Sequence, residues 1–88
     1  MSPILAGEQV AVPERMVVAP GPGVFRARTG DVPSGMVVVE LDEEIGRLEV
    51  PGSVVSIRSP FRGRLMGMLA RDGERLREGQ AVAWLRIA

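Results

Sequence analysis

"SPFRGRLMGMLARDGERLREGQAVAWLRI", residues 59–87, alternates short apolar runs with glycine and proline. Within it, GRLMGMLA (63–70) and AVAWLRI (81–87) show the two-residue alternation of β-strands, whose successive side chains point to opposite faces of a sheet. Glycine and proline stand at the junctions, where the chain must reverse. The stretch therefore predicts strands joined by tight turns. Only ARDGERLREG (70–79) has a hint of helical spacing, and Gly73 weakens it.

The rest of the chain repeats this pattern. Further strand candidates are RMVVA (15–19), GVFRAR (23–28), MVVVEL (36–41), IGRLEV (45–50) and SVVSIRS (53–59). Several short strands at this spacing favour an all-β sandwich or barrel. The first residues are less regular, so we interpret 1–13 as a tail or edge segment and 14–88 as a single domain.

The chain also contains an internal repeat. VAPGPGVFRA (18–27) aligns with RSPFRGRLMG (58–67), and GDVPSGMVVVEL (30–41) aligns with GERLREGQAVAWL (73–85). The matched residues are Pro20 with Pro60, Gly23 with Gly63, and Gly35 with Gly79. A duplicated strand-turn-strand unit implies quasi-two-fold symmetry, with the two halves sharing one core because neither half buries its apolar face alone.

The missing residue types limit the chemistry. Histidine, lysine, cysteine, tyrosine and asparagine are all absent, and all 11 basic residues are arginine. The chain therefore lacks the usual general base near neutral pH, the amine and thiol nucleophiles, and the nitrogen and sulfur ligands of zinc. We expect neither a metal nor another cofactor, and the composition favours a binding protein over an enzyme.

Residues 59–87 resemble the C-terminal half of biotinyl/lipoyl carrier domains. The positions that fill that pattern are Ser59-Pro60, Gly63, Gly73-Glu74, Leu76, Gly79-Gln80 and Val82. VVAPGPGVFRA (17–27) is similar to the N-terminal half of the biotin carboxyl carrier protein. The resemblance covers about residues 16–88 and implies a barrel-sandwich hybrid, a flattened β-barrel of two four-stranded antiparallel sheets with quasi-two-fold symmetry.

The family carries its prosthetic group on a lysine at a hairpin tip, within Glu-Ala-Met-Lys or Asp-Lys-Ala. Counting back from Pro60 places Glu49-Val50-Pro51-Gly52 on the tetrapeptide and Gly52 on the lysine; counting forward from Gly35 places Ile45 there instead. Neither residue offers an amine. The resemblance therefore implies a domain that cannot carry biotin or lipoate itself.

The predicted partner-binding residues fall in three groups. The hairpin tip contributes Val50, Pro51, Gly52 and Ser53; an acidic segment contributes Asp42, Glu43 and Glu44; and an arginine-rich segment contributes Arg62 and Arg64. Residues 40–49 hold five acids and one arginine, whereas residues 58–77 hold six arginines and two acids. These opposite local charges favour orientation toward charged partners, or pairing of the two segments within or between molecules.

Three functions remain open. The first is a non-acylated, carrier-like binding, adaptor or regulatory module for an acyl-CoA carboxylase or acyl-processing complex, such as one of natural-product biosynthesis. The second is a small tailoring enzyme that uses Asp or Glu as acid/base and arginine to hold an anion. The third is a structural assembly domain.

The remaining expectations concern location and partners. No signal-like or membrane-spanning run is found in the sequence, so we expect a cytoplasmic protein without a membrane partner. Zero net charge and few aromatic residues argue against nucleic acid. We expect a protein partner, and self-association into a homo-oligomer stays open.

Overall fold

A computed structural model describes residues 13–28 and 34–87. Their strands are β1 (Glu14–Val18), β2 (Gly23–Ala27), β3 (Val37–Val39), β4 (Glu44–Val50), β5 (Ser53–Arg58), β6 (Gly63–Met68), β7 (Arg75–Leu76) and β8 (Ala81–Arg86). The all-β prediction is confirmed. All but β7 lie where the alternation predicts a strand, with ends that differ by a few residues. The predicted segment 1–13 lies, apart from Pro13, outside the described residues.

β7 lies in the segment whose spacing hinted at a helix, and that hint is wrong. Gly73 and Gly79 have φ values of 88° and 82°, in the left-handed region that glycine adopts without a steric penalty. Turns at these two glycines leave room for only a short strand between them. That strand pairs with β2 through Leu76 opposite Gly23.

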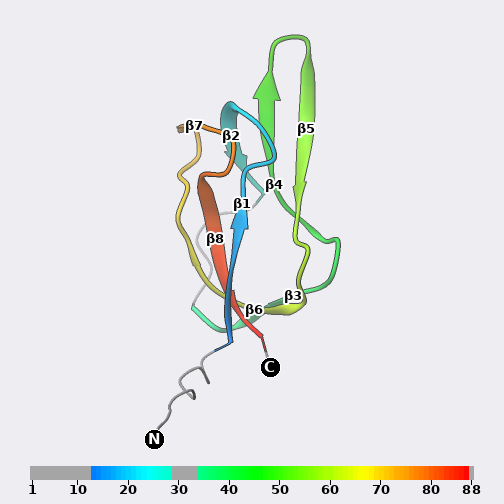
Figure 1. Ribbon diagram of the computed structural model, residues 1–88, viewed down its shortest axis with the longest axis vertical. Helices are drawn as coiled ribbons and strands as arrows, with labels where there is room; N and C mark the ends of the chain where they lie inside the picture. Colours follow the sequence, from blue (N-terminus) through cyan, green and yellow to red (C-terminus); the bar gives the residue numbers. More distant parts are fainter. Residues whose placement is uncertain (1–12, 29–33, 88) are drawn as a thin grey trace, which may run out of the picture.

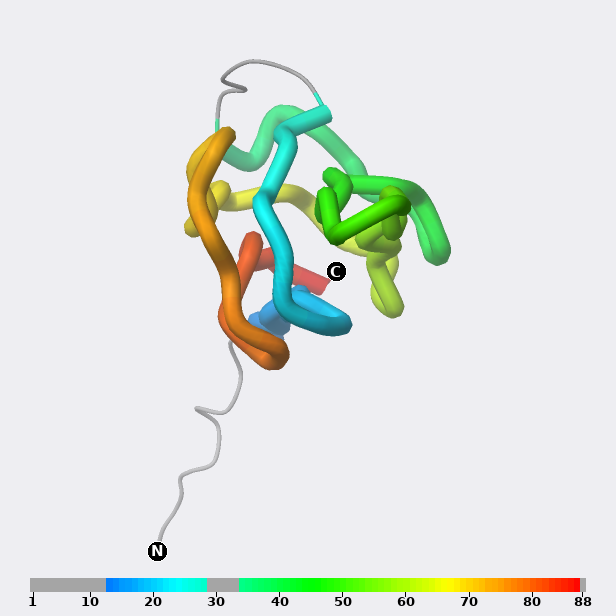
Figure 2. The backbone as a smooth tube through the Cα atoms, turned by 90° about the horizontal axis from the view of Figure 1, so that it is seen from above, coloured from blue at the N-terminus to red at the C-terminus, as the bar shows by residue number. Residues whose placement is uncertain are grey.

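The strands form two antiparallel four-stranded sheets, with orders β1-β8-β6-β3 and β5-β4-β2-β7. Figure 1 shows β1 and β8 side by side, with the long β4–β5 hairpin rising above them. In Figure 2 the second sheet extends from the orange segment of β7 through the cyan β2 to the green hairpin. The predicted pair of sheets is thus confirmed, as a flattened sandwich whose sheets do not close into a barrel.

The inner faces of the two sheets supply one apolar core. Its largest fully buried side chains are Phe25, Leu48, Ile57, Leu76, Leu85, Val17, Val39 and Val82. Both sheets contribute to this set, as a sandwich requires. Among the described residues, no helix is long and apolar enough to span a membrane.

The sheet orders express the internal repeat. Adding four to each strand number of β1-β8-β6-β3, and counting β8 as followed by β1, gives β5-β4-β2-β7, the order of the other sheet. Each half of the chain therefore contributes two strands to each sheet. This arrangement confirms the quasi-two-fold organisation predicted from the aligned segments.

Gly23 and Gly63 are confirmed as equivalent residues. A Cβ at Gly23 would lie 2.9 Å from the carbonyl oxygen of Glu49, and a Cβ at Gly63 would lie 2.7 Å from that of Arg86. In each half, the glycine starts a strand where the backbone of the neighbouring strand approaches too closely for any side chain. The glycine match is therefore a packing requirement of the duplicated sandwich.

The predicted match of Gly35 with Gly79 is wrong. The amide of Gly79 donates to the carbonyl of Ala19 at 2.8 Å, and the equivalent bond in the other half runs from Asp42 to Ser59 at 2.7 Å. Asp42 also shares the left-handed backbone of Gly79, with φ of 68°. The counterpart of Gly79 is therefore an aspartate, which an alignment of glycines cannot find.

Gly35 instead corresponds to Gly73. Its amide donates to the carbonyl of Leu65 at 2.8 Å, just as the amide of Gly73 donates to that of Phe25 at 2.7 Å. Both glycines have a positive φ, and each precedes the short edge strand of its sheet.

Candidate functional site

A tight turn forms the tip of the β4–β5 hairpin. Val50 and Ser53 are paired across the two strands, so Pro51 and Gly52 are the only residues between them. Proline followed by a residue of positive φ is the pattern of a type II turn, and Gly52 has φ of 75°. An added Cβ at Gly52 would meet no atom within 4 Å. The tip is therefore a rigid corner open to its surroundings.

The structure distinguishes the two positions at which the resemblance could place the family's lysine. Gly52 lies at the tip, whereas Ile45 lies inside β4 with 5 % of its surface exposed. Of the two positions, only the one at Gly52 is therefore exposed. Neither residue carries an amine.

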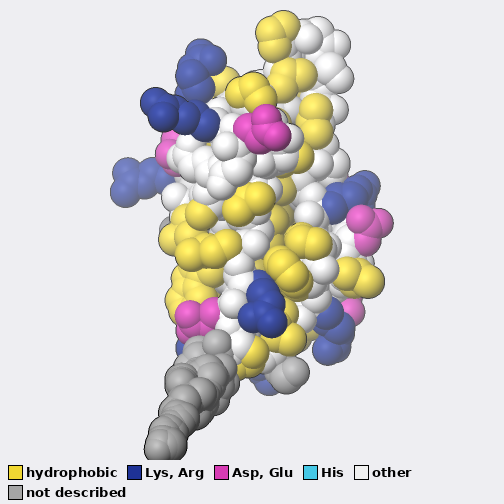
Figure 3. Space-filling view, viewed as in Figure 1, with side chains coloured by type: hydrophobic (Ala, Val, Ile, Leu, Met, Phe, Trp, Pro, Cys, Tyr) yellow, Lys and Arg dark blue, Asp and Glu magenta, His cyan; other side chains and the backbone are white. Residues whose placement is uncertain are grey.

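An apolar groove lies behind the tip. It has a volume of about 280 Å³ and is lined by residues 20–22 and by Leu48, Val50, Pro51 and Val55. Leu48, Val50 and Val55 share the inner face of the hairpin, because alternate residues of a strand point the same way and Leu48 is paired with Val55. Figure 3 shows hydrophobic side chains along this projecting hairpin.

The sequence predicted the tip but not the groove. The PGPG turn at 20–23 and the apolar alternation of 48–55 are both visible in the sequence. What brings them together is the pairing of β2 with β4, which joins residues distant along the chain.

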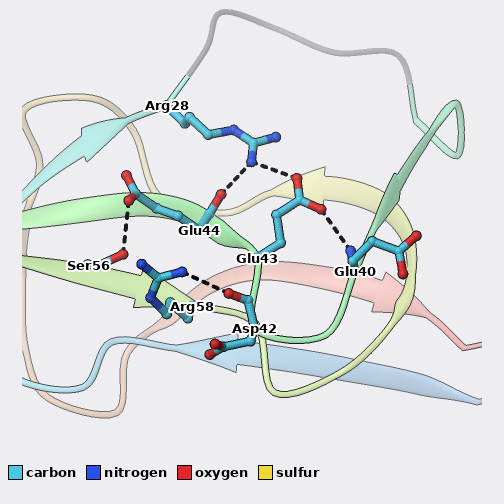
Figure 4. A network of polar contacts seen from close by, with 7 residues as sticks. All are labelled: Arg28, Glu40, Asp42, Glu43, Glu44, Ser56 and Arg58. Carbon is cyan, nitrogen blue, oxygen red and sulfur yellow. Dashed lines mark hydrogen bonds and ion pairs between the residues drawn. The ribbon is translucent and has the colours of Figure 1, made fainter.

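The acidic segment is occupied by internal contacts, shown in Figure 4. The carboxylate of Glu43 accepts a hydrogen bond from the amide of Glu40 at 2.8 Å and from Nη1 of Arg28 at 2.7 Å. These two contacts, the backbone one first, lower the pKa of Glu43. Glu43 thus closes the turn that enters β4, in the way that Gln80 accepts from the amide of Arg77 at 3.0 Å in the other half.

Glu44 and Asp42 flank that residue and are held in the same network. The carboxylate of Glu44 accepts from Nε of Arg47 at 2.8 Å and from the hydroxyl of Ser56 at 3.0 Å, and these bonds lower its pKa. The carbonyl oxygen of Asp42 accepts from Nη1 of Arg58 at 2.9 Å. A general acid near neutral pH needs a raised pKa, so Glu43 and Glu44 are tuned in the opposite direction.

The arginine-rich segment meets the acidic one directly. Nε of Arg62 lies 2.8 Å from a carboxylate oxygen of Glu40, although both side chains are more than half exposed. Arg64 donates to the carbonyl of Gly35 at 3.3 Å. Pairing of the two segments within one molecule, one of the predicted alternatives, therefore occurs at Glu40. Exposed pairs of this kind contribute at most about 1 kcal/mol.

The predicted site residues do not form one site. The tip lies at the end of β4, and Asp42, Glu43 and Glu44 lie at its start, about 20 Å away at the usual rise of a strand. Within residues 13–28 and 34–87, no group of acidic side chains is arranged to hold a metal ion. The tip and its groove are thus an exposed surface that is free for a partner among the described residues. The acidic segment, in contrast, is held by contacts within the molecule.

No family model and no curated protein matches this sequence.

Proposed function

We propose that this chain is a non-acylated biotinyl/lipoyl-like module that works by docking, in the cytoplasm, on an acyl-CoA carboxylase or another acyl-processing complex. The observation that carries the proposal is the β4–β5 hairpin. Its tip lies where the resemblance places the modified lysine, and it holds Pro51-Gly52 instead. A partner that accepts such a hairpin meets a rigid corner backed by an apolar groove.

Two further observations support a docking role. The order of the two sheets follows the duplicated organisation that the resemblance implies, and the β4–β5 hairpin joins the two halves of that organisation. The hairpin also projects from the end of the molecule opposite the start of β1 and the end of β8 in Figure 1. A tip placed this way reaches a partner before the rest of the domain does.

The chemistry of the acidic segment favours docking over catalysis. Glu43 and Glu44 both have lowered pKa values, because arginine, serine and backbone donors hold their charged forms. Carboxylates fixed in this way stabilise the entry to β4 and are poor proton donors near neutral pH.

Installing a lysine at the tip tests the scaffold. A variant with Val50→Ala, Pro51→Met and Gly52→Lys, which retains Glu49, is incubated with biotin, ATP and a biotin protein ligase and analysed by mass spectrometry. We expect the added mass of one biotinyl group on this variant and none on the wild type. Gly79→Lys is the matched control, because Gly79 also has a positive φ and open space around it.

Equal labelling of the tip variant and of Gly79→Lys would contradict a specific carrier-like tip, and so would no labelling of a folded tip variant. Far-ultraviolet circular dichroism establishes that each variant keeps its β-structure.

Affinity capture tests the docking role. We expect wild-type protein to recover subunits of an acyl-CoA carboxylase or acyl-processing complex from its host, and Pro51→Arg to lose them. Glu78→Arg places the same side chain at another exposed turn and should capture as the wild type does. Capture that is unaffected by Pro51→Arg would exclude the tip as the contact.

A further inference from the structure

β5 is the end strand of its sheet, and its outer edge is unpaired among the described residues. Val50 of β4 and Ser53 of β5 flank a two-residue turn and therefore form a hydrogen-bonded pair with each other. Because such pairs alternate along an antiparallel ladder, Val54 and Ser56 direct their N–H and C=O groups away from β4. Between Ser53 and Ile57, each molecule thus presents four backbone groups along one open edge.

The part of this edge from Ser53 to Ile57 lacks the features that usually prevent strand addition. Val54 and Val55 are 57 % and 39 % exposed, and β5 contains no proline and no charge before Arg58. Natural edge strands are commonly protected by charges, prolines or bulges. The open edge of β5 is therefore suited to pairing with another strand.

The equivalent edge in the other half is protected. By the repeat, β1 corresponds to β5, with Pro13 in the place of Ser53 and Glu14 in the place of Val54. Glu14 forms an ion pair of 3.0 Å with Arg86 on β8. The two halves share a fold but differ in this respect, which points to a role specific to β5.

The open groups of β5 are self-complementary. In an antiparallel pair centred on Val55, Val54 of one copy lies opposite Ser56 of the second, and Ser56 lies opposite Val54. Both are then hydrogen-bonded pairs, and the four open groups of Val54 and Ser56 in each copy find partners. The two Val55 side chains meet on the inner face, beside the apolar groove that each Val55 lines.

The charges agree with this register. On β4, Arg47 lies beside Ser56 and Glu49 lies beside Val54. On the outer face, four side chains therefore line up across the interface. They are Arg47 and Ser56 of one copy, followed by Val54 and Glu49 of the other copy. The two charges are three strand spacings, about 14 Å, apart, and no like charges are brought face to face, so a second copy of this chain fits the edge without repulsion.

We infer that this protein forms a two-fold symmetric dimer through β5, which joins the two copies of its sheet into one continuous sheet of eight strands. The interface is small, so the dimer is reversible and forms at high protein concentration. The inference goes beyond the proposed docking function and does not rest on it.

Cysteine substitution tests the register, because the chain has no cysteine of its own. Residues of a pair that is not hydrogen-bonded lie about 4.5 Å apart at Cα, within the range that a disulfide spans. Val55→Cys should therefore give a disulfide-linked dimer under mild oxidation. Val54→Cys is the matched control. Its thiol faces Ser56 of the second copy, and the Cα atoms of the two substituted residues are more than about 7 Å apart, too far for a disulfide.

Sedimentation equilibrium of the cysteine-free protein tests the edge itself. Ser56→Pro removes an N–H that β4 does not use, and Ser56→Ala controls for the lost hydroxyl contact with Glu44. We expect wild type and Ser56→Ala to approach twice the mass of one chain as concentration rises, and Ser56→Pro to weaken dimerisation at least about tenfold.

Three results would each overturn the inference: a wild type that stays monomeric at millimolar concentration, a folded Ser56→Pro that dimerises as the wild type does, or cross-linking of Val54→Cys equal to that of Val55→Cys. Failure here is distinguishable from failure of the docking proposal, because the biotinylation and capture experiments do not depend on dimerisation.

Discussion

Gly46 shows how closely the core fits around a single residue. A Cβ at this position would lie 2.5 Å from Cε1 of Phe25, whose side chain is fully buried. In the other half Ala83 takes the equivalent place, while the smaller Leu65 takes that of Phe25. The two halves thus distribute similar volume in different ways.

We expect Gly46→Ala to destabilise the protein by about 1–3 kcal/mol, because the added methyl group forces the ring of Phe25 out of its place. Urea denaturation followed by the fluorescence of Trp84 measures this. Gly21→Ala is the matched control: a Cβ at Gly21 meets no atom within 4 Å, so its effect should be much smaller. Equal effects of the two variants would contradict the packing explanation.

Asp42 gives a second prediction at this scale. It has φ of 68° where its counterpart Gly79 has φ of 82°. A side chain in this region is strained by about 1–2 kcal/mol, and aspartate by less than most residues. We expect Asp42→Gly to leave stability unchanged or to raise it by up to about 1 kcal/mol, and Asp42→Ala to lower it. Thermal unfolding of the two variants measures the difference, and the opposite order would disprove the equivalence with Gly79.

Some of the equivalent residues in the two halves can be predicted from the sequence, and others cannot. The sequence match of Gly23 with Gly63 is correct because both halves require the same residue for the same close approach. The equivalence of Asp42 with Gly79 cannot be found in the sequence, because aspartate tolerates the left-handed backbone without resembling glycine. Only the backbone hydrogen bonds make that equivalence visible.

At the scale of elements, the entry to β4 is held by ionised carboxylates. The pKa values of Glu43 and Glu44 are lowered below their ordinary value of 4.5 in the folded protein. The folded state therefore binds protons less readily than the unfolded state does. The resulting stability is fully present above about pH 4.5 and is lost as the pH falls through the folded-state pKa values.

We expect the urea midpoint to fall as the pH is lowered from 6 to 3, and Glu43→Gln to show a shallower fall. The amide of glutamine still accepts from the amide of Glu40, but it cannot lose a charge opposite Arg28. Glu78→Gln, at an exposed turn residue, is the matched control for the loss of one charge. A Glu43→Gln profile parallel to that of the wild type would contradict this account.

The strands were largely predictable because apolar alternation records burial directly, as in AVAWLRI of β8. β7 was not, since two residues between turns leave no periodicity to detect. The contacts of the acidic segment were also hidden: Arg28, which binds Glu43, is 15 residues away in the sequence. Sequence reasoning found the charges of segment 40–49 but not the contacts that occupy them.

At the scale of the whole molecule, the predicted two halves and two sheets are confirmed, whereas the functional role of the tip stays a proposal. The sandwich could be predicted because its repeat leaves matched prolines and glycines in the sequence. The exposed surface of β5 could not, because strand order within a sheet decides which strand is left at an edge. The fold could therefore be predicted from the sequence, whereas the candidate partner surface becomes visible only once the strand order is known.

The contact between Pro13 and Ile87, the first and last described residues, has a consequence of its own. The amide of Ile87 donates to the carbonyl of Pro13 at 2.8 Å, in the place where Val50 pairs with Ser53 in the other half. A short linker from Ile87 to Pro13 and a new opening between Pro51 and Gly52 would give a circularly permuted protein with the same neighbours throughout. The amide exchange pattern of the permuted protein should match that of the parent. The closed loop then joins Ile87 to Pro13, and Pro51 and Gly52 become the two free ends of the chain.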